Sequence, residues 1–151
     1  MSVWSNIAYV IAGLLLWDNP VICISMIALG ASSAMAHWKG GFWWRMDWAT
    51  MYLSFGAICL HNFGIPPLLS VNLGALGGTF GYDNYYLFGT LFAVTILSAY
   101  LIGISVIIPL ALFALALAFQ RYAESHMGTK TYEIYHSLWH VLTATSMYLL
   151  V

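Results

Sequence analysis

The sequence predicts an all-α protein, a polytopic transmembrane bundle of seven short helices. Of its 151 residues, 62% are hydrophobic and 6% are charged, a composition that suits contact with lipid better than a soluble core. The few charged residues fall between long apolar runs and divide the chain into spans. The net charge of −1 excludes an electrostatic nucleic-acid binder, so the expected partner is the membrane bilayer.

Charged residues and prolines mark the ends of the expected helices. Asp18 ends the first apolar run, and Pro20 follows as a first-turn proline. The uncharged run 84–119 would be about 54 Å long as one helix, whereas a hydrocarbon core is about 30 Å thick. It therefore holds two spans, or one span and a re-entrant piece, with a turn near 101–105 and a kink at Pro109. The expected helices cover 3–17, 20–38, 46–62, 66–80, 84–101, 103–120 and 131–151.

Six helices remain the alternative, because several of these spans are shorter than about 20 residues. Parity favours seven. If His37 at the end of the second helix meets His136 and His140 in the last one, an even number of helices lies between them. No internal repeat or soluble linker divides the chain, so residues 1–151 form a single domain. The start of the chain lacks a basic segment and a cleavage site, so no cleavable signal peptide is expected.

Polar residues gather at one end of this predicted bundle. Ser33 and His37 are four residues apart, as are His136 and His140, so each pair shares one face of a helix. Asp47 is expected to open the third helix at the same end. Ionisable residues at membrane depth are costly and usually face the bundle interior or a water-filled cavity. This grouping favours a metal site slightly over histidines that serve packing.

Three neutral imidazoles suit a zinc ion. Each nitrogen can lie about 2.0–2.1 Å from the metal, and the fourth position stays open for a water whose pKa falls to about 7. Soluble zinc proteases carry a glutamate directly after the first histidine, but Ser137 follows His136 here. Asp47 is the natural candidate for the base. Ser33 can hydrogen-bond the water or a substrate oxyanion.

The ordered set of Ser5-Asn6, "SSAMAH" ending at His37, Asp47 and "HSLWH" from His136 resembles the CREST superfamily of seven-helix membrane proteins. This superfamily includes alkaline ceramidases, the adiponectin-receptor and hemolysin III family, and the myomaker branch. The resemblance spans residues 5–140 and leaves the branch open. It implies a zinc ion held by His37, His136 and His140, catalytic Asp47 and Ser33 beside a zinc-activated water, and hydrolysis of a lipid amide such as ceramide or another N-acyl lipid.

The chain also departs from one branch of this superfamily. Alkaline ceramidases carry an acidic calcium-binding segment before the first helix, whereas four residues precede Ser5 here, so that regulatory site is not expected. The loops are short, which indicates a minimal member of the superfamily.

Two other classes of function compete with a zinc-dependent hydrolase of a lipid amide or ester. The first is a non-catalytic, receptor-like or membrane-remodelling protein in which zinc is structural. The second is a haem protein. His136 and His140 cannot both be axial ligands of one haem, so that hypothesis needs His37 as well. A retinal protein is disfavoured because the two lysines, Lys39 and Lys130, fall in loops.

Several further residues receive weaker interpretations. Ser5 and Asn6 either start a helix or lie near the site. Glu133 is a first-turn carboxylate favoured by the helix dipole, with orientation of His136 as the alternative. His61 and Asn62 are expected to cap the third helix or to contact lipid headgroups. His126 is expected in a solvated loop, and Asp83 in a turn. Four tryptophans near the second break form an interfacial belt: Trp38, Trp43, Trp44 and Trp48.

The basic residues predict the orientation. All four lie in the two loops that seven helices place on one side, and basic loops tend to be cytoplasmic. The N-terminus and the zinc site are therefore expected on the cytoplasmic side, with the C-terminus outside. The basic residues are Lys39, Arg45, Arg121 and Lys130.

Overall fold

The computed structural model describes residues 3–80 and 84–151, and this part of the chain consists of helices and the turns that connect them. The predicted all-α class is confirmed, whereas the turn assigned to Asp83 lies outside the described residues. Within the described residues there are seven α-helices and two short 3-10 helices, η1 and η2. In chain order the elements are η1 (Val3–Asn6), α1 (Ile7–Leu15), α2 (Pro20–Lys39), α3 (Phe42–Asn62), η2 (Pro67–Leu69), α4 (Ser70–Phe80), α5 (Tyr85–Leu101), α6 (Ile107–Glu124) and α7 (Lys130–Tyr148).

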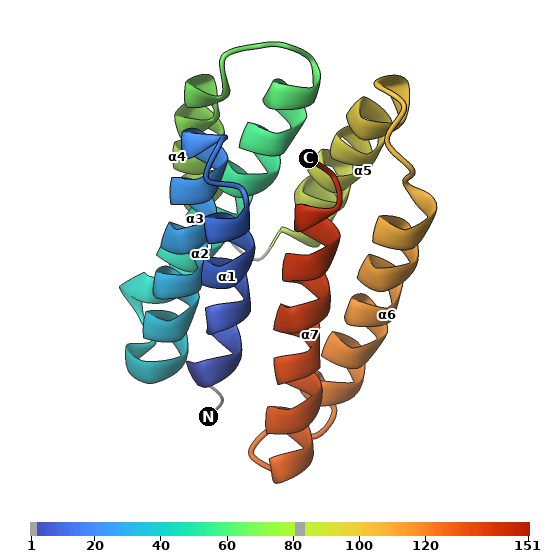
Figure 1. The fold of residues 1–151 in the computed structure, drawn as a ribbon. Coiled ribbons are helices and arrows are strands. Elements are labelled where there is room, and N and C mark those ends of the chain that lie inside the picture. The colour runs from blue at the N-terminus through green and yellow to red at the C-terminus, as the bar shows by residue number, and fades with distance from the viewer. Residues whose placement is uncertain (1–2, 81–83) are drawn as a thin grey trace.

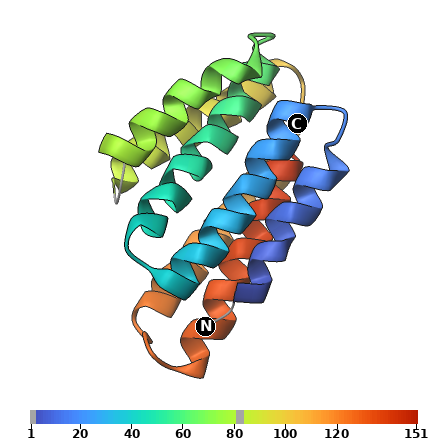
Figure 2. The ribbon, with the colours of Figure 1, turned by 90° about the vertical axis from the view of Figure 1, so that its left-hand side faces the viewer.

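The helices run up and down in a single bundle (Figure 1). Packing follows the order α4, α3, α2, α1, α7, α6, with α5 against α3 on the other side. The end of α2, the start of α3, the end of α6 and the start of α7 all lie at the lower end of the bundle in Figure 1. Figure 2 shows the same arrangement from the side, with α7 next to α1. This arrangement brings His37 of α2 to the same end as the first half of α7.

The helices differ in their capacity to cross a membrane. Among the described residues, α2 with 20 residues and α6 with 18 are both long and apolar enough to do so. α3 and α7 have 21 and 19 residues but carry more polar side chains. α4 has only 11 residues, which at 1.5 Å per residue is about 16 Å and roughly half of a hydrocarbon core.

Several helix boundaries differ from those expected, among them the starts of α3 and α6. α3 begins at Phe42 rather than at residue 46, because Gly40 and Gly41 adopt φ values of 66° and 56° and complete a tight turn directly after α2. Asp47 therefore lies in the second turn of α3 and does not open the helix. α6 begins at Ile107, after a connection that contains the left-handed Gly103. Pro109 lies in the first turn, where its missing N–H has no helical acceptor to lose, so it starts α6 rather than kinking it.

Aromatic side chains join α5 and α6 to the rest of the bundle. The rings of Phe92 and Phe113 stack with their centroids 3.7 Å apart. Phe55 of α3 meets Phe88, Phe92 and Phe113 edge-on at 5.5–6.1 Å. Edge-on contacts are a favourable arrangement for aromatic rings. This cluster fixes α5 and α6 beside α3 and bounds the cavity described below.

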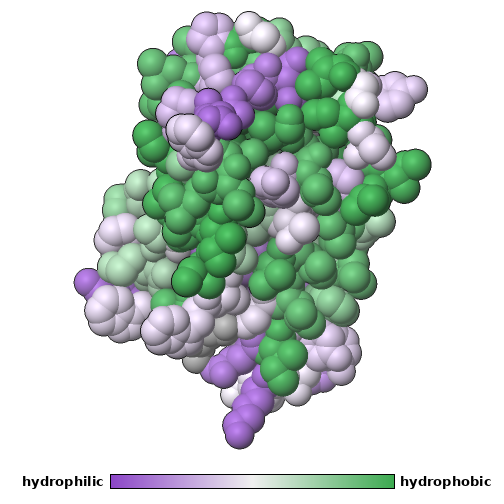
Figure 3. All heavy atoms as spheres, in the orientation of Figure 1, coloured by the Kyte–Doolittle hydropathy of each residue, from purple (hydrophilic) through white to green (hydrophobic). Residues whose placement is uncertain are grey.

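Many large apolar side chains are exposed on the surface, and some small polar ones are buried beside the apolar core. Large apolar side chains lie on the outside, among them Ile7, Leu15 and Ile107, each more than half exposed. Small polar side chains lie inside, and the hydroxyls of Ser32 and Thr50 join α2 to α3 at 2.6 Å. Figure 3 shows a largely green surface, with purple residues mainly toward its upper and lower ends. Soluble monomers rarely expose so large an apolar area.

Candidate metal centre

Three buried histidines from two helices meet inside the bundle. His37 lies in the last turn of α2, and His136 and His140 lie one turn apart on α7. The ring centroid of His37 is 4.6 Å from that of His136 and 5.3 Å from that of His140. The centroids of His136 and His140 are 4.5 Å apart. The predicted meeting of these residues is confirmed. Their burial and spacing make the cluster close enough to bind a metal ion.

Local sequence fixes the register of each ligand-bearing helix. Thr129 caps α7 by accepting a hydrogen bond from the backbone N–H of Tyr132, which sets where the helix starts. The Gly40–Gly41 turn ends α2 two residues after His37, and α3 begins at Phe42 directly after this turn. Both histidine-bearing segments are thus held at defined heights at the same end of the bundle.

The nitrogen positions suit a small tetrahedral ion. The Nε2 atoms of His37 and His136 are 2.9 Å apart, and one ring nitrogen from each of the three histidines lies within 4.8 Å of the others. Nitrogens bound to zinc at about 2.0–2.1 Å in a tetrahedron lie roughly 3.3 Å from one another. The observed separations bracket that value, so the side chains need only small rotations to hold such an ion.

Asp47 and Ser33 lie on the same cavity as the histidines. The cavity has a volume of about 140 Å³, and the Asp47 carboxylate in it accepts a hydrogen bond from Ser33. Ser33 is one turn before His37 on α2, whereas Asp47 reaches the cavity from the second turn of α3. All five site residues expected from the sequence therefore face one space, although Asp47 arrives there from inside its helix and not from its start.

Other side chains complete the site, and sequence reasoning missed most of them. The Ser5 hydroxyl lies 2.9 Å from Nδ1 of His140, which favours the interpretation that placed Ser5 near the site. Asn6 is buried, and its side chain does not cap α1. Gln120 of α6, which no motif indicated, lies 2.7 Å from Nδ1 of His136. In the sequence, the one feature that distinguishes Gln120 is a polar amide at the end of a long apolar run.

Two of the four tryptophans line the cavity rather than an interfacial belt. Trp44 meets the His37 ring edge-on at 5.1 Å, and Trp48 lies on the cavity wall with Phe88 at 6.1 Å. These contacts favour a role in the cavity wall for both residues. Trp38 is 71% exposed, with the Lys39 ammonium 5.0 Å from its ring, as expected at an interface. Side chains four residues apart on α3 point to the same side, which brings Trp44 and Trp48 inward together.

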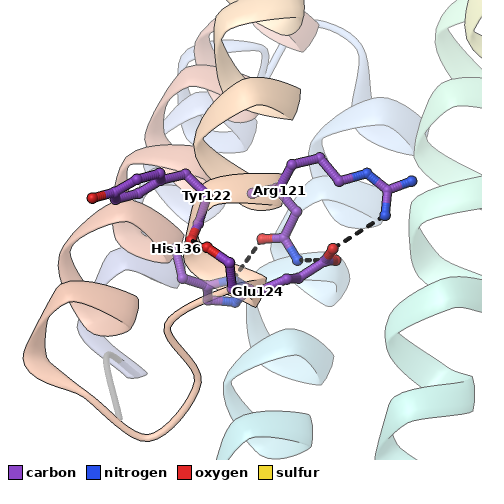
Figure 4. A network of polar contacts seen from close by, with 6 residues as sticks. Arg121, Tyr122, Glu124 and His136 are labelled. Carbon is purple, nitrogen blue, oxygen red and sulfur yellow. Dashed lines mark hydrogen bonds and ion pairs between the residues drawn. The ribbon is translucent and has the colours of Figure 1, made fainter.

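A chain of polar contacts leads from His136 toward the surface (Figure 4). Gln120 donates a hydrogen bond from its amide to Glu124 at 3.1 Å, and Glu124 pairs with Arg121 at 3.2 Å. The Arg121 side chain is 69% exposed. All three residues belong to the last turns of α6, and all three line the same cavity as the histidines.

The remaining polar residues lie away from this cavity. Glu133 is in the first turn of α7 and lines a surface groove with Lys130 and Trp4, in agreement with the first-turn interpretation. Asn62 is buried at the far end of α3 and donates hydrogen bonds to Ser98 and to the backbone of Leu150. Its expected role as a cap or headgroup contact is wrong, because it joins α3 to α5 and to the end of the chain.

Comparison of the chain with family models, curated proteins and solved structures finds no match.

Proposed function

We propose that this chain is a zinc-dependent membrane hydrolase of the CREST type that cleaves an amide, or an ester, of a lipid. One observation carries the proposal: three buried histidines, a carboxylate and a hydroxyl from three helices face a single cavity. The set matches zinc in ligand type and number, and it leaves one coordination position for a reactant.

The surface supports insertion of the whole bundle into a bilayer. Its outward side chains are apolar around α1, α5 and α6, whereas Ser32, Thr50 and Ser54 are buried and their hydroxyls are hydrogen-bonded. Lys39 and Lys130 lie at the end that also holds the histidines, with Arg45 and Arg121 within a few residues of it. The positive-inside tendency then makes this end cytoplasmic, with seven crossings and the C-terminus on the opposite side.

The cavity wall suggests the class of substrate. Apolar and aromatic side chains from four helices, Leu29, Met51, Phe88 and Leu117, lie beside the polar groups. Such a wall suits the hydrocarbon next to a scissile carbonyl, while the polar cluster suits the carbonyl itself. A lipid amide or ester combines these two chemistries and reaches the site from the bilayer.

Each polar residue has a definite task in this proposal. Bound zinc supplies a Lewis acid that makes water nucleophilic near neutral pH. Asp47 accepts a proton from water in the cavity and can return it to the leaving nitrogen or oxygen. Ser33 donates to the Asp47 carboxylate and keeps it oriented toward the histidines. The aromatic wall of Trp48 and Phe88 limits bulk water around these groups.

A structural role for zinc is the second candidate, and the order in which the helices pack supports it. α2 is separated from α7 by α1 in the packing order, so a metal held by His37, His136 and His140 would fasten two helices that share few other contacts in the described chain. Haem is disfavoured, because a porphyrin cannot lie between two nitrogens 2.9 Å apart.

Metal analysis combined with a lipid screen tests the proposal. Purified protein should contain about one zinc per chain, and His140→Ala should lose most of it. Wild type and His140→Ala are then incubated with ceramides, other N-acyl lipids and phospholipids, and the released fatty acid is measured. Zinc retained in all three single His→Ala variants would disprove the ligand set. A wild type that holds zinc but releases no fatty acid would favour the structural role.

A further inference from the structure

Gln120 makes two hydrogen bonds that together determine which way its amide points. It is the only glutamine in the chain and lies near the end of α6. Its nitrogen donates to the Glu124 carboxylate at 3.1 Å, since a carboxylate accepts and does not donate. The amide oxygen is therefore the atom that faces His136 Nδ1 at 2.7 Å.

The orientation of this amide determines the tautomer of His136. A carbonyl oxygen only accepts, so Nδ1 of His136 must carry the proton in this contact. The lone pair is then on Nε2, the atom that faces Nε2 of His37 at 2.9 Å. Nε2 is also the nitrogen that points into the histidine cluster. The partner on one side of the ring thus fixes the binding atom on the other side.

Glu124 is positioned to hold the amide in this orientation. Its two carboxylate oxygens are divided between neighbours: Oε1 accepts from Gln120, and Oε2 accepts from Arg121 at 3.2 Å. The Glu124 side chain is 28% exposed and the Arg121 side chain 69% exposed, so the chain of contacts passes from the surface to the buried His136 ring. Without Glu124, the amide would lose the partner that distinguishes its nitrogen from its oxygen.

We infer that Gln120, oriented by Glu124, is a positioning residue that holds His136 with Nδ1 protonated and Nε2 presented to a metal ion. The inference rests on the metal-binding part of the proposed function and not on the hydrolysis. Neither residue touches the metal position. Their effect is to raise affinity, because a free imidazole spends part of its time in the other tautomer or rotated away from the ion.

Zinc affinity of the purified full chain in detergent, measured by competition with a chromophoric chelator, tests this inference. Gln120→Leu should bind zinc about 10–100-fold more weakly, the usual cost of losing a partner of a ligand histidine. Glu124→Leu should weaken binding in the wild type but add nothing in the Gln120→Leu background, because Glu124 acts through Gln120. Cobalt bound in place of zinc should show an altered visible spectrum in Gln120→Leu if the ring orientation changes.

An exchange variant separates positioning from mere structural support. In Gln120→Glu/Glu124→Gln the carboxylate still accepts from His136, the amide still donates to it, and the net charge is unchanged. This variant should bind zinc at least as tightly as the wild type. Glu133→Gln is the matched control: it changes a carboxylate one turn before His136 that faces the surface groove, and it should leave affinity unchanged.

Two outcomes overturn the inference: unchanged zinc affinity in Gln120→Leu, or an exchange variant as weak as Gln120→Leu. A wild type without zinc affinity would overturn it together with the metal site. The hydrolase is tested separately. A chain that binds zinc in the predicted Gln120-dependent way but cleaves no lipid would disprove hydrolysis and still support the inference.

Discussion

Replacing Asp47 by asparagine removes a negative charge from the cavity while preserving the shape of the side chain. Asp47 faces the three histidines from the second turn of α3 and accepts a hydrogen bond from Ser33. The amide oxygen of asparagine can accept the same bond, so the fold and the histidine cluster should persist. What the variant loses is the capacity to accept a proton. Its rate therefore distinguishes a base from a residue that only supports the site.

The contacts of Asp47 set the expected magnitudes. A positioned general base contributes about 10²–10⁴-fold to a rate, which corresponds to about 2.7–5.4 kcal/mol in the barrier. Ser33→Ala removes one hydrogen bond to a charged acceptor, about 1.5–3 kcal/mol, so its effect on the rate should be smaller than that of Asp47→Asn. In an Asp47→Asn background the acceptor is neutral, and loss of the Ser33 hydroxyl should cost only about 0.5–1.5 kcal/mol. The two substitutions should therefore be non-additive.

The assay measures kcat for a cleaved lipid amide or ester, with zinc content determined on the same samples. Asp47→Asn should keep its zinc and lose at least about 100-fold in kcat. Full activity in this variant would refute the base assignment. Loss of zinc together with activity would also refute it, because Asp47 would then act on metal retention rather than on the proton.

Three further outcomes test the packing, the topology and the hydroxyl beside His140. Gly30→Ala should lower the thermal stability, since a Cβ there would lie 2.9 Å from the backbone oxygen of Asn6 and overpacking costs about 1–3 kcal/mol. Gly89→Ala is its control, because nothing lies within 4 Å of the added Cβ and α5 should gain up to about 1 kcal/mol in helix propensity; equal melting shifts would contradict the packing argument. A reporter after Val151 should be extracytoplasmic and one in the loop 125–129 cytoplasmic, and reporters on the same side would exclude a membrane crossing by α7. Ser5→Ala should weaken zinc binding by about tenfold through the lost contact with His140 Nδ1, whereas unchanged affinity would make that contact incidental.

The sequence alone determined the fold class and the principal residues of the candidate site. Apolar runs separated by charged residues indicate helices, because each run must keep its backbone hydrogen-bonded internally where lipid surrounds it. The spacing of His136 and His140 places both rings on one helix face whatever the neighbours are. A count of seven helices then places His37 at their end of the bundle, and the ring distances of 4.6 and 5.3 Å agree with this placement.

Only the tertiary structure decided which side chains surround the histidines. Gln120 and Ser5 come from elements whose neighbours depend on lateral packing, and helical periodicity says which residues share a face but not which helix that face meets. The same reason explains Trp44 and Trp48, whose composition fits an interface equally well. The start of α3 differs from the expected one for a different reason. Gly40 and Gly41, both with positive φ, make the turn before α3 short enough to start it at Phe42, and the pattern of apolar residues does not indicate these φ values.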